Sequence, residues 1–437
     1  MSGAVPLADT TRSASPSARA GEWTVSPRYA WLVLILTFSL LLSDYMSRQV
    51  LSAVFPLLKA EWGLSDTALG SLGSAVALVV GLLTLPLSFI ADRVGRIRSI
   101  VAMAMLWSLA TLACALSRRY GDLLAARVFV GVGEAAYGSV GVAVAVSVFP
   151  ARMRALIVGM FTAGGVFGSV LGVGLGGVIA EQMGWRWSFA AMAFVGAALG
   201  AVYPLFVSEP ARDAQNETAE AYLARPRTLV AALFPSRTVF FTYVGSGLQL
   251  FISSSFIAWT PSFLHRYYGM GTGRASAIAS ALVLVGGLGM IAWGHVADRL
   301  SVFAPSRRLL LACILCFSTS VILAAGLSFP PGAVQLVFVA SAMLLAAGTL
   351  GPAGAIVADA TDVALHATVF ATLTFANNVL GLAPGPILTG FIADHSSLLA
   401  ALRVVPAFGV AAGTAFTIAY FDFNRLAYVS GRSTASE

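Results

Sequence analysis

The strongest constraint on the fold is a series of about twelve apolar runs, each roughly 20 residues long, which is the length of an α-helix that crosses a bilayer. Hydrophobic residues make up 58% of the 437-residue chain and charged residues only 10%, a composition far outside that of soluble globular proteins. We therefore predict an all-α membrane protein. The predicted spans begin near Ala30, Ala68, Ser99, Asp122, Ala155, Phe189, Val239, Ala275, Leu309, Ala333, Ala367 and Leu398.

The charged residues indicate how the chain is oriented in the membrane. It carries 26 Lys and Arg against 19 Asp and Glu, a net charge of +7. With both termini placed in the cytoplasm, most of the Lys and Arg fall on cytoplasmic segments, the bias that sets membrane topology. This distribution gives no reason to expect a nucleic acid partner. The preference for Arg over Lys, with abundant Ala and Gly, favours a bacterial inner (plasma) membrane, where we expect a monomer surrounded by the lipid bilayer.

The sequence does not predict a metal site, a cofactor or an enzyme. Cys313 and Cys316 form a C-x-x-C, but no His or second Cys pair accompanies it, and together with Cys114 they are expected to be packing residues. No phosphate-binding loop is present, so ATP-driven transport is unsupported. The predicted spans also lack a nucleophile and base arrangement, so an intramembrane enzyme is not expected.

A short motif recurs at the ends of the second and eighth predicted spans. Ala-Asp-Arg followed by a basic cluster occurs at residues 91–93 and again at residues 297–299. A second echo relates Ile-Ala-Glu181 to Ile-Ala-Asp394, each after similarly spaced glycines. These repeats predict two parallel, pseudo-symmetric six-helix bundles. The two motifs are expected to gate the movement between the bundles, or else simply to anchor their loops, through Asp92, Arg93, Gly95, Arg96, Arg98, Asp298 and Arg299.

The repeats also divide the chain into domains. We predict a disordered cytoplasmic tail at residues 1–28, which are rich in Ser, Ala and Pro. The two bundles are expected at residues 29–208 and 238–421. Between them, residues 209–237 form the one long polar stretch and are predicted to be a cytoplasmic linker, and residues 422–437 are predicted to be a second cytoplasmic tail.

The motif after the second span, A-D-R-x-G-R-x-R, resembles the loop signature of the major facilitator superfamily, and the resemblance runs over nearly the whole chain. Within that superfamily, Gln49-Val-Leu-Ser-Ala-Val-Phe-Pro56 and Gly381-Leu-Ala-Pro-Gly-Pro386 look like the spinster-like branch. The related anion:cation symporters share part of this pattern. The resemblance implies a secondary transporter that alternates access between two halves, with spans one and four beside the central path.

Four charged residues fall within predicted spans, where a charge costs roughly 2.5–3.5 kcal/mol to insert and usually has a function. Asp44 and Arg48 are four residues apart, so they share a helix face and can neutralise each other. Arg127 and Glu134 are seven residues apart and line one face of their helix. We expect Glu134 and Asp44 to bind protons. Arg48 and Arg127 are expected to bind an anionic substrate. The alternative is a permanent ion pair that only ties two helices together.

The first span departs from the pattern of the resembled families. Their members usually read N-Y-x-D-R there, whereas this chain places Ser47 at the acidic position and Asp44 one turn away. Asp44 can replace the missing acid geometrically, because residues three apart share a helix face.

Several other polar residues at membrane depth are candidates for a substrate pocket. They are Tyr137, Gln249, Trp259, Asn377 and Asn378. For each of them a hydrogen bond that merely joins neighbouring helices is the simpler alternative.

From these features we predict a proton-coupled secondary active transporter that moves a small organic anion of the carboxylate type across the inner membrane by alternating access. The sequence leaves symport and antiport both open. The predicted partners are the small-molecule substrate, protons and lipid. A lysolipid or amphiphile transporter of the spinster type is the first alternative, and a transport-inactive sensor is another. A drug/proton antiporter is a further one, because residues 168–177 nearly match an antiporter glycine motif, although Val173 takes its proline position and close helix packing explains the glycines more simply.

Overall fold

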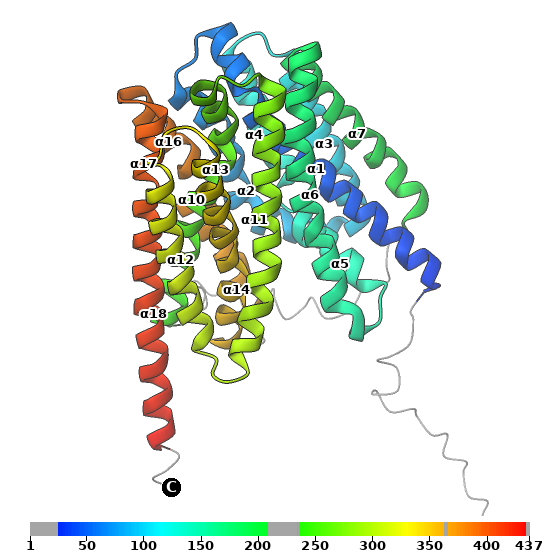
Figure 1. Ribbon diagram of the computed structural model, residues 1–437. Helices are drawn as coiled ribbons and strands as arrows, with labels where there is room; N and C mark the ends of the chain where they lie inside the picture. Colours follow the sequence, from blue (N-terminus) through cyan, green and yellow to red (C-terminus); the bar gives the residue numbers. More distant parts are fainter. Residues whose placement is uncertain (1–24, 209–233, 235, 362–365, 434–437) are drawn as a thin grey trace, which may run out of the picture.

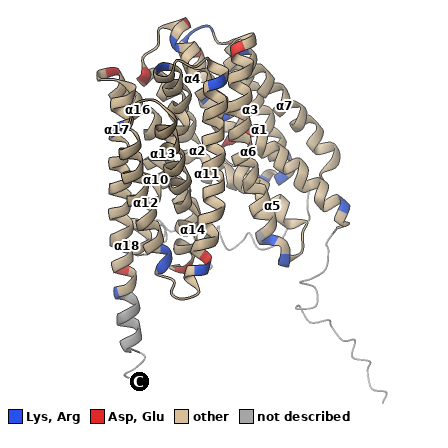
Figure 2. Cartoon of the chain, in the orientation of Figure 1, with Lys and Arg blue, Asp and Glu red and all other residues tan. Residues whose placement is uncertain are grey.

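The structure is a computed structural model that describes residues 25–208, 234, 236–361 and 366–433. It contains 12 helical segments long and apolar enough to cross a membrane, and the described residues form no strand. The predicted all-α membrane fold is therefore confirmed. Figure 2 shows that charged residues gather near the two ends of the helices, with largely uncharged spans between them.

The first half of the chain forms six spans. Its helices are α1 (Pro27–Trp62), α2 (Asp66–Val94), α3 (Arg96–Leu116), α4 (Tyr120–Glu134), α5 (Tyr137–Ser147), the 3-10 turn η2 (Ala151–Met153), α6 (Arg154–Met183) and α7 (Trp185–Phe206). Helices α4 and α5 together make the fourth span, which is interrupted directly after Glu134.

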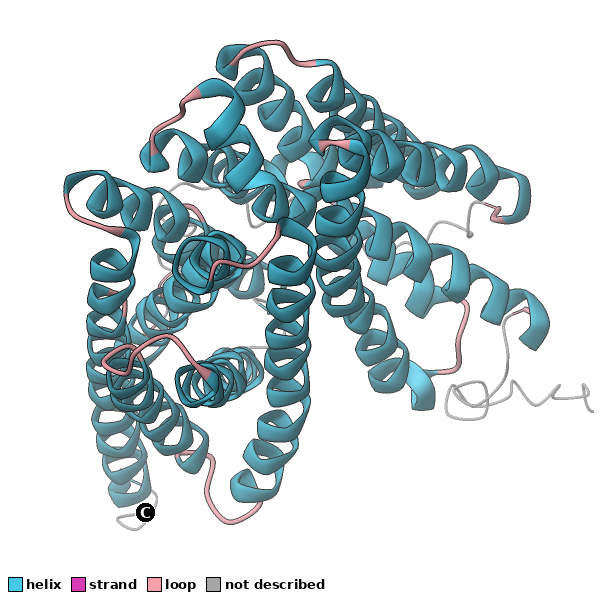
Figure 3. Ribbon diagram, turned by 45° about the horizontal axis from the view of Figure 1, so that its top comes forward, coloured by secondary structure: helices cyan, strands magenta, loops and turns pink. Residues whose placement is uncertain are grey.

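The second half forms the other six spans beside the first (Figures 1 and 3). Its helices are α10 (Arg237–Tyr268), α11 (Thr272–Ser301), α12 (Arg307–Gly326), α13 (Ala333–Ala346), η4 (Ala347–Thr349), α14 (Leu350–Asp359), α15 (His366–Asn377), the π-helix η6 (Asn378–Leu382), α16 (Pro384–His395), α17 (Leu398–Val404) and α18 (Pro406–Ser433). Most of the predicted tail 1–28 and linker 209–237 lies outside the described residues. The last helix continues to Ser433, past residue 421 where the second bundle was expected to end.

Equivalent helices in the two halves end in the same way, which gives the internal repeat a local physical basis. Helix α1 ends at Gly63 with φ 62°, and α10 ends at Gly269 with φ 63°. Both glycines adopt the left-handed conformation that terminates a helix and that residues with a Cβ disfavour. Each half thus turns back sharply after its first span.

Helices α1 and α6 pack closely because one glycine ridge faces α1. Gly168, Gly172 and Gly176 recur every four residues on α6, and each lies so close to α1 that an added Cβ would clash. Small residues let helix backbones approach in this way. Such packing is needed because apolar side chains in lipid have no hydrophobic driving force to associate. The glycine run that resembles an antiporter motif therefore serves as a packing surface in this structure.

Two antiparallel seams join the halves, and the repeat relates one to the other. In one seam α2 packs on α16, and in the other α11 packs on α6. Gly70 lies against the backbone of Pro386, and Gly177 lies against Ser276, with no room for a Cβ at either position. We call the end of the molecule at which α2 begins the Asp66 end, and the opposite end the Asp92 end. Both Ala-Asp-Arg motifs lie at the Asp92 end, because α2 and α11 run in the same direction.

This arrangement predicts which loops share a membrane face. Val94→Cys and Val302→Cys, beside the two motifs, should be labelled by a membrane-impermeant maleimide from one side. Their side chains are 54% and 83% exposed. Arg119→Cys, in the turn between α3 and α4 at the Asp66 end, should be labelled from the other side. The three natural cysteines are buried and would be replaced in the background. Labelling of Val94→Cys and Val302→Cys from opposite sides would contradict the fold.

Candidate functional site

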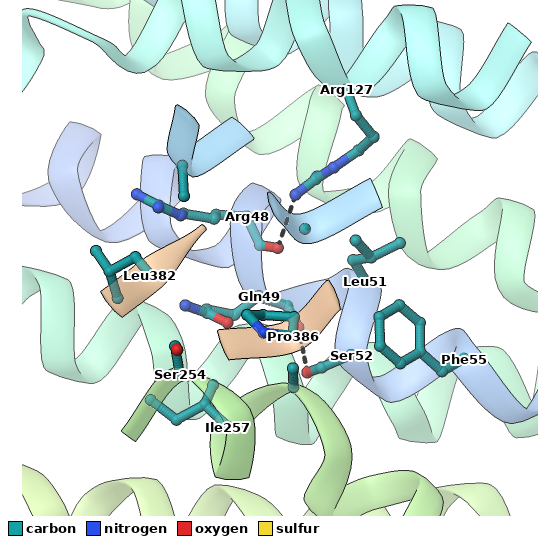
Figure 4. Close-up of a pocket in the computed structure, with 13 residues that line it drawn as sticks. Arg48, Gln49, Leu51, Ser52, Phe55, Arg127, Ser254, Ile257, Leu382 and Pro386 are labelled. Atoms are coloured by element: carbon teal, nitrogen blue, oxygen red, sulfur yellow. Dashed lines mark hydrogen bonds between the residues drawn. The ribbon is translucent and has the colours of Figure 1, made fainter. Parts of the chain in front are cut away.

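A pocket lies between the two halves, near the middle of the spans (Figure 4). It contains about 500 Å³ of space not filled by protein atoms, counting its open side. Both halves contribute to its wall, as expected for a path between two bundles. The lining residues are Arg48, Gln49, Leu51, Ser52 and Phe55 of α1, Gly73 and Ala77 of α2, Arg127 of α4, Ser254, Ile257 and Ala258 of α10, Leu382 of η6 and Pro386 of α16.

The wall contributed by the eleventh span is a break in regular helix. Residues Asn378–Leu382 form a π-helix in which the amide of Ala383 donates to the carbonyl of Asn378 at 2.8 Å. Prolines at positions 384 and 386 lack the amide hydrogen that a continuous α-helix would use there. The Ser254 hydroxyl donates to the Gly381 carbonyl at 3.0 Å and so ties α10 to this segment. Such π-helical turns are frequent at functional sites.

Arg127 is completely buried, and its guanidinium is held by backbone carbonyls. It donates to Leu72 O at 3.4 Å, Ser47 O at 3.1 Å and Arg48 O at 3.2 Å. These bonds join α4 to α1 and α2 at the wall of the pocket. A carbonyl in a helix has a second lone pair free for such a bond. Arg127 therefore fixes the backbone of α1 next to Arg48.

Arg48 is in a different situation, although it lines the same pocket. It is only partly buried, and its guanidinium forms no hydrogen bond or ion pair with another residue in the described part of the chain. A guanidinium offers five donors in a planar fork that fits a carboxylate with two parallel bonds. Arg48 is thus a cation facing an open pocket with its donors available.

The two intramembrane acids lie outside the pocket lining. Asp44 is 6% exposed and Glu134 is 5% exposed. One carboxyl oxygen of Asp44 and both carboxyl oxygens of Glu134 accept no hydrogen bond from an N–H or O–H donor of the described residues. The two carboxyl groups lie close enough to share a hydrogen bond when one of them carries a proton. The acids are close enough to influence each other and Arg48 electrostatically. They lie one to two helical turns from the arginines, toward the Asp92 end.

The expected neutralisation of Asp44 by Arg48 does not occur as an ion pair in this structure. Within the described residues, no salt bridge of 4.0 Å or less joins any two of the four intramembrane charges. A permanent ion pair between helices is therefore not what holds these side chains. Ser47, at the position where the resembled families carry an acid, donates its hydroxyl to the Ser43 carbonyl at 3.0 Å.

Tyr137 and Trp259 are buried by packing and do not line the pocket. The Tyr137 hydroxyl donates to the Thr37 carbonyl at 2.6 Å, and its ring packs edge-on against Trp107 within the first half. The Trp259 indole donates to the Pro386 carbonyl at 3.0 Å, and its ring lies 5.2 Å from that of Phe55. Trp259 thus supports the pocket wall from behind.

The three predicted amides also bond to neighbouring helices or to their own helix. The Gln249 amide nitrogen donates to Thr319 at 3.4 Å, and the Asn377 oxygen accepts a bond from Ser246 at 2.8 Å. The Asn378 nitrogen donates to Thr374 O at 2.9 Å. None of the three lines the pocket. Gln49, Ser52 and Phe55 line the pocket although the sequence did not single them out. Ser52 and Phe55, four and seven residues after Arg48, follow the helix period and could have been found from it.

The two Ala-Asp-Arg motifs, which were expected to act in gating, lie at the Asp92 end, away from the pocket. Asp92 pairs with Arg96 at 3.2 Å within its own loop, and Gly95 adopts φ 114° between α2 and α3. In the second half, Arg308 pairs with Asp298 at 3.4 Å and with Asp359. The side chains of Arg93, Arg98 and Arg299 are on the exposed surface.

Both the sequence and the fold of this chain resemble those of known proteins. The sequence profile of the Major Facilitator Superfamily matches residues 37–386. The chain is 27% identical to the hexuronate transporter of Bacillus subtilis (strain 168) over 379 residues, covering 83% of this chain and 88% of that protein. It is 26% identical over 381 residues to a sphingosine-1-phosphate transporter of Danio rerio, covering 82% of this chain and 75% of the relative.

A similar fold is found in a bacterial homolog of the human lysosomal transporter spinster, solved in an inward-facing and unoccupied conformation. The TM-score is 0.81 at 19% sequence identity, covering 92% of this chain and 99% of that one, so the likeness concerns the fold. Because the superfamily profile covers most of the chain and agrees with its twelve spans, this protein belongs to the Major Facilitator Superfamily, and it is a membrane transporter rather than an enzyme.

Proposed function

We propose that the protein is a proton-coupled symporter that carries a small organic anion of the carboxylate type. The observation that carries this proposal is Arg48, whose guanidinium lies at the pocket between the halves without a partner among the described residues. A buried or half-buried cation without a counterion is costly, so binding an anion there is favoured. The hexuronate transporter that this chain resembles handles a carboxylate by its name.

The remaining polar lining residues supply contacts for the rest of the substrate. The side-chain amide of Gln49 forms no hydrogen bond with another described residue, and it provides both donors and an acceptor. The hydroxyls of Ser52 and Ser254 donate to backbone carbonyls and keep their oxygens as acceptors. A carboxylate substrate that also carries hydroxyl groups would find hydrogen-bond partners for those groups in Gln49, Ser52 and Ser254.

The two buried acids provide the proposed coupling to protons. An ionised carboxylate without a partner is expensive at such a site, so Asp44 and Glu134 are cheapest to bury when they carry protons. Asp44 and Arg48 lie four residues apart on α1, about one helical turn, and their charges interact. When Asp44 loses its proton, its negative charge competes with the substrate anion for Arg48. Proton binding to Asp44 and anion binding to Arg48 therefore favour each other.

We infer that the Asp92 end faces the cytoplasm of a bacterial inner membrane, with both termini on that side. The arginine-rich loops after α2 and α11 support this orientation. The seam between α6 and α11 is tight from Gly177 to Gly287, whereas an added Cβ at Gly159 or Gly294, nearer the Asp92 end, would meet nothing within 4 Å. The pocket is then reached from the cytoplasm, as in the inward-facing structure that this fold resembles.

Transport of a lysolipid or another amphiphile is the second candidate function. The pocket wall includes several apolar residues, Leu51, Phe55, Ile257, Leu382 and Pro386. The similarity to a sphingosine-1-phosphate transporter gives this alternative further support. An acyl chain would contribute about 0.8 kcal/mol for each buried CH₂ group.

Arg48→Lys should weaken binding of an anionic substrate by roughly 10- to 150-fold, although the charge is retained. Lysine is a compact point charge that cannot form two parallel bonds to a carboxylate, and one lost charge-assisted bond costs about 1.5–3 kcal/mol. Isothermal titration with a panel of sugar acids measures the effect, and Arg119→Lys at the surface is the matched control. An affinity that instead rises with acyl-chain length and is insensitive to Arg48→Lys would replace the carboxylate with an amphiphile.

Arg127→Lys should have a different signature, because this side chain is bonded to three carbonyls on α1 and α2. Lysine cannot reach all three from one position, so the thermal unfolding temperature should fall by several degrees. Substrate affinity should fall with it, since the wall beside Arg48 loses its support. A variant with wild-type thermal stability and selectively lost affinity would instead assign Arg127 to direct substrate contact.

Glu134→Gln should abolish uptake driven by a proton gradient while substrate exchange without a gradient continues. Glutamine keeps the size and hydrogen-bonding capacity of the side chain but cannot bind and release a proton. Counterflow and gradient-driven uptake in liposomes separate the two activities. Asp44→Asn should reduce coupling to a smaller extent, and Asp122→Asn at the exposed start of α4 serves as the control. Gradient-driven uptake that persists in Glu134→Gln would exclude this residue from coupling.

A further inference from the structure

At the Asp66 end, the second half caps the first turn of α2. The Asp394 carboxylate, at the end of α16, accepts bonds from the amides of Asp66 and Thr67 at 2.7 and 2.8 Å and from the Thr67 hydroxyl at 2.6 Å. The first amides of a helix have no partner within it, and the helix dipole favours a negative charge there. Here the capping acid comes from the opposite bundle rather than from the residues before α2.

An ion pair between the halves reinforces this cap. Arg266, near the end of α10, donates through both terminal nitrogens to the Asp66 carboxylate at 2.7 and 2.6 Å. Lys59 of α1 donates to the same carboxylate at 2.6 Å. The Asp66 side chain is only 4% exposed, so water screens this bidentate pair less than it would a surface pair. We call Lys59, Asp66, Thr67, Arg266 and Asp394 the Asp66 latch.

The internal repeat places a related contact in the other seam. Glu181 ends the Ile-Ala-Glu segment of α6 just as Asp394 ends the Ile-Ala-Asp segment of α16. Its carboxylate lies against Gly271 and Gly273, at the start of α11, where an added Cβ would clash with it. Each seam therefore sets an acid from one half at the first turn of a helix in the other half.

The two repeat-related contacts differ in strength. The Asp66 latch has three hydrogen bonds to the start of α2 and a bidentate ion pair between the halves. For Glu181, no hydrogen bond or ion pair with another described residue accompanies its position at α11. The seam of α2 and α16 is thus stabilised by hydrogen bonds and an ion pair, while the seam of α6 and α11 is stabilised by close packing.

We propose that the Asp66 latch is the device that keeps the Asp66 end closed, and that its release admits access to the pocket from that end. To open there, α2 must leave α10 and α16, which breaks every bond of the latch between the halves. The Glu181 contact lies at the same end and has no hydrogen bond or ion pair with another described residue to break. This inference rests on the alternating access of the proposed function, but it does not depend on the substrate or on protons.

Accessibility of the pocket from each membrane face tests the latch directly. Ala258→Cys, which lines the pocket, serves as the reporter in a background without the three buried natural cysteines. A membrane-impermeant maleimide is applied to vesicles of each orientation, without substrate or gradient. Adding Asp394→Ala or Arg266→Gln should raise the labelling rate from the Asp66 end at least tenfold and lower it from the Asp92 end.

Matched variants separate the latch from a general effect on folding. Glu181→Ala should raise labelling from the Asp66 end much less than Asp394→Ala does. Asp122→Ala, at the same end but paired within one half, should leave the rate unchanged. Equal rates in Asp394→Ala, Arg266→Gln and Asp122→Ala would overturn the proposal, as would a Glu181→Ala effect equal to that of Asp394→Ala. Loss of proton-driven uptake alone would leave these rates unaffected, so the two proposals fail independently.

If Asp394→Ala does not fold, a cross-link provides a second test. Lys59→Cys with Arg266→Cys leaves Asp394 intact and places one thiol in each half, where the two wild-type side chains donate to the same Asp66 oxygen. Joining them with a short bifunctional reagent should block labelling of the reporter from the Asp66 end and stop transport. Labelling from the Asp92 end should continue. Transport that continues after complete cross-linking would contradict the requirement for latch release.

Discussion

The constraint on which the rest of the structure depends is the cost of burying charge where water cannot reach it. Arg127 meets this cost with three backbone carbonyls, which at the same time join α4 to α1 and α2. Asp44 and Glu134 have carboxyl oxygens that accept no hydrogen bond from an N–H or O–H donor of the described residues, a situation that a proton relieves. Arg48 faces the pocket, where an anion relieves it. The cost of burying a charge is thus met by backbone carbonyls at Arg127. We propose that protons meet it at the two acids and that a bound anion meets it at Arg48.

The second requirement is that two bundles pack tightly while remaining able to move relative to each other. Lipid does not drive helices together as water does, so close approach depends on small residues. Gly70 and Gly177 provide that approach at equivalent places in the two seams. The helices of each seam run antiparallel. The hydrogen bonds and the ion pair described between the two halves lie at the Asp66 end. One bundle can therefore move relative to the other by breaking only a few specific contacts.

Interrupted helices connect these two requirements at the pocket. The fourth span breaks directly after Glu134, and the eleventh span contains a π-helix between Asn378 and Leu382. Irregular backbone at membrane depth is tolerated where it is covered by protein or lines a cavity. Both breaks lie where charge or substrate is proposed to be handled, and a broken helix can change its geometry with little cost to the remainder of the span.

The sequence by itself determined the twelve spans, the two-part repeat and the identity of the intramembrane charges, because apolar length, repeated motifs and charge at depth are local properties. The sequence also singled out Arg48 and Arg127, and the structure has both of them in the lining of one pocket. It did not predict that Arg127 is bonded to carbonyls, that Asp44 and Arg48 form no ion pair, or that Tyr137 and Asn377 are packing residues. Those outcomes, and the capping of α2 by Asp394, depend on which helices from distant parts of the chain lie side by side, and only the tertiary structure decided them.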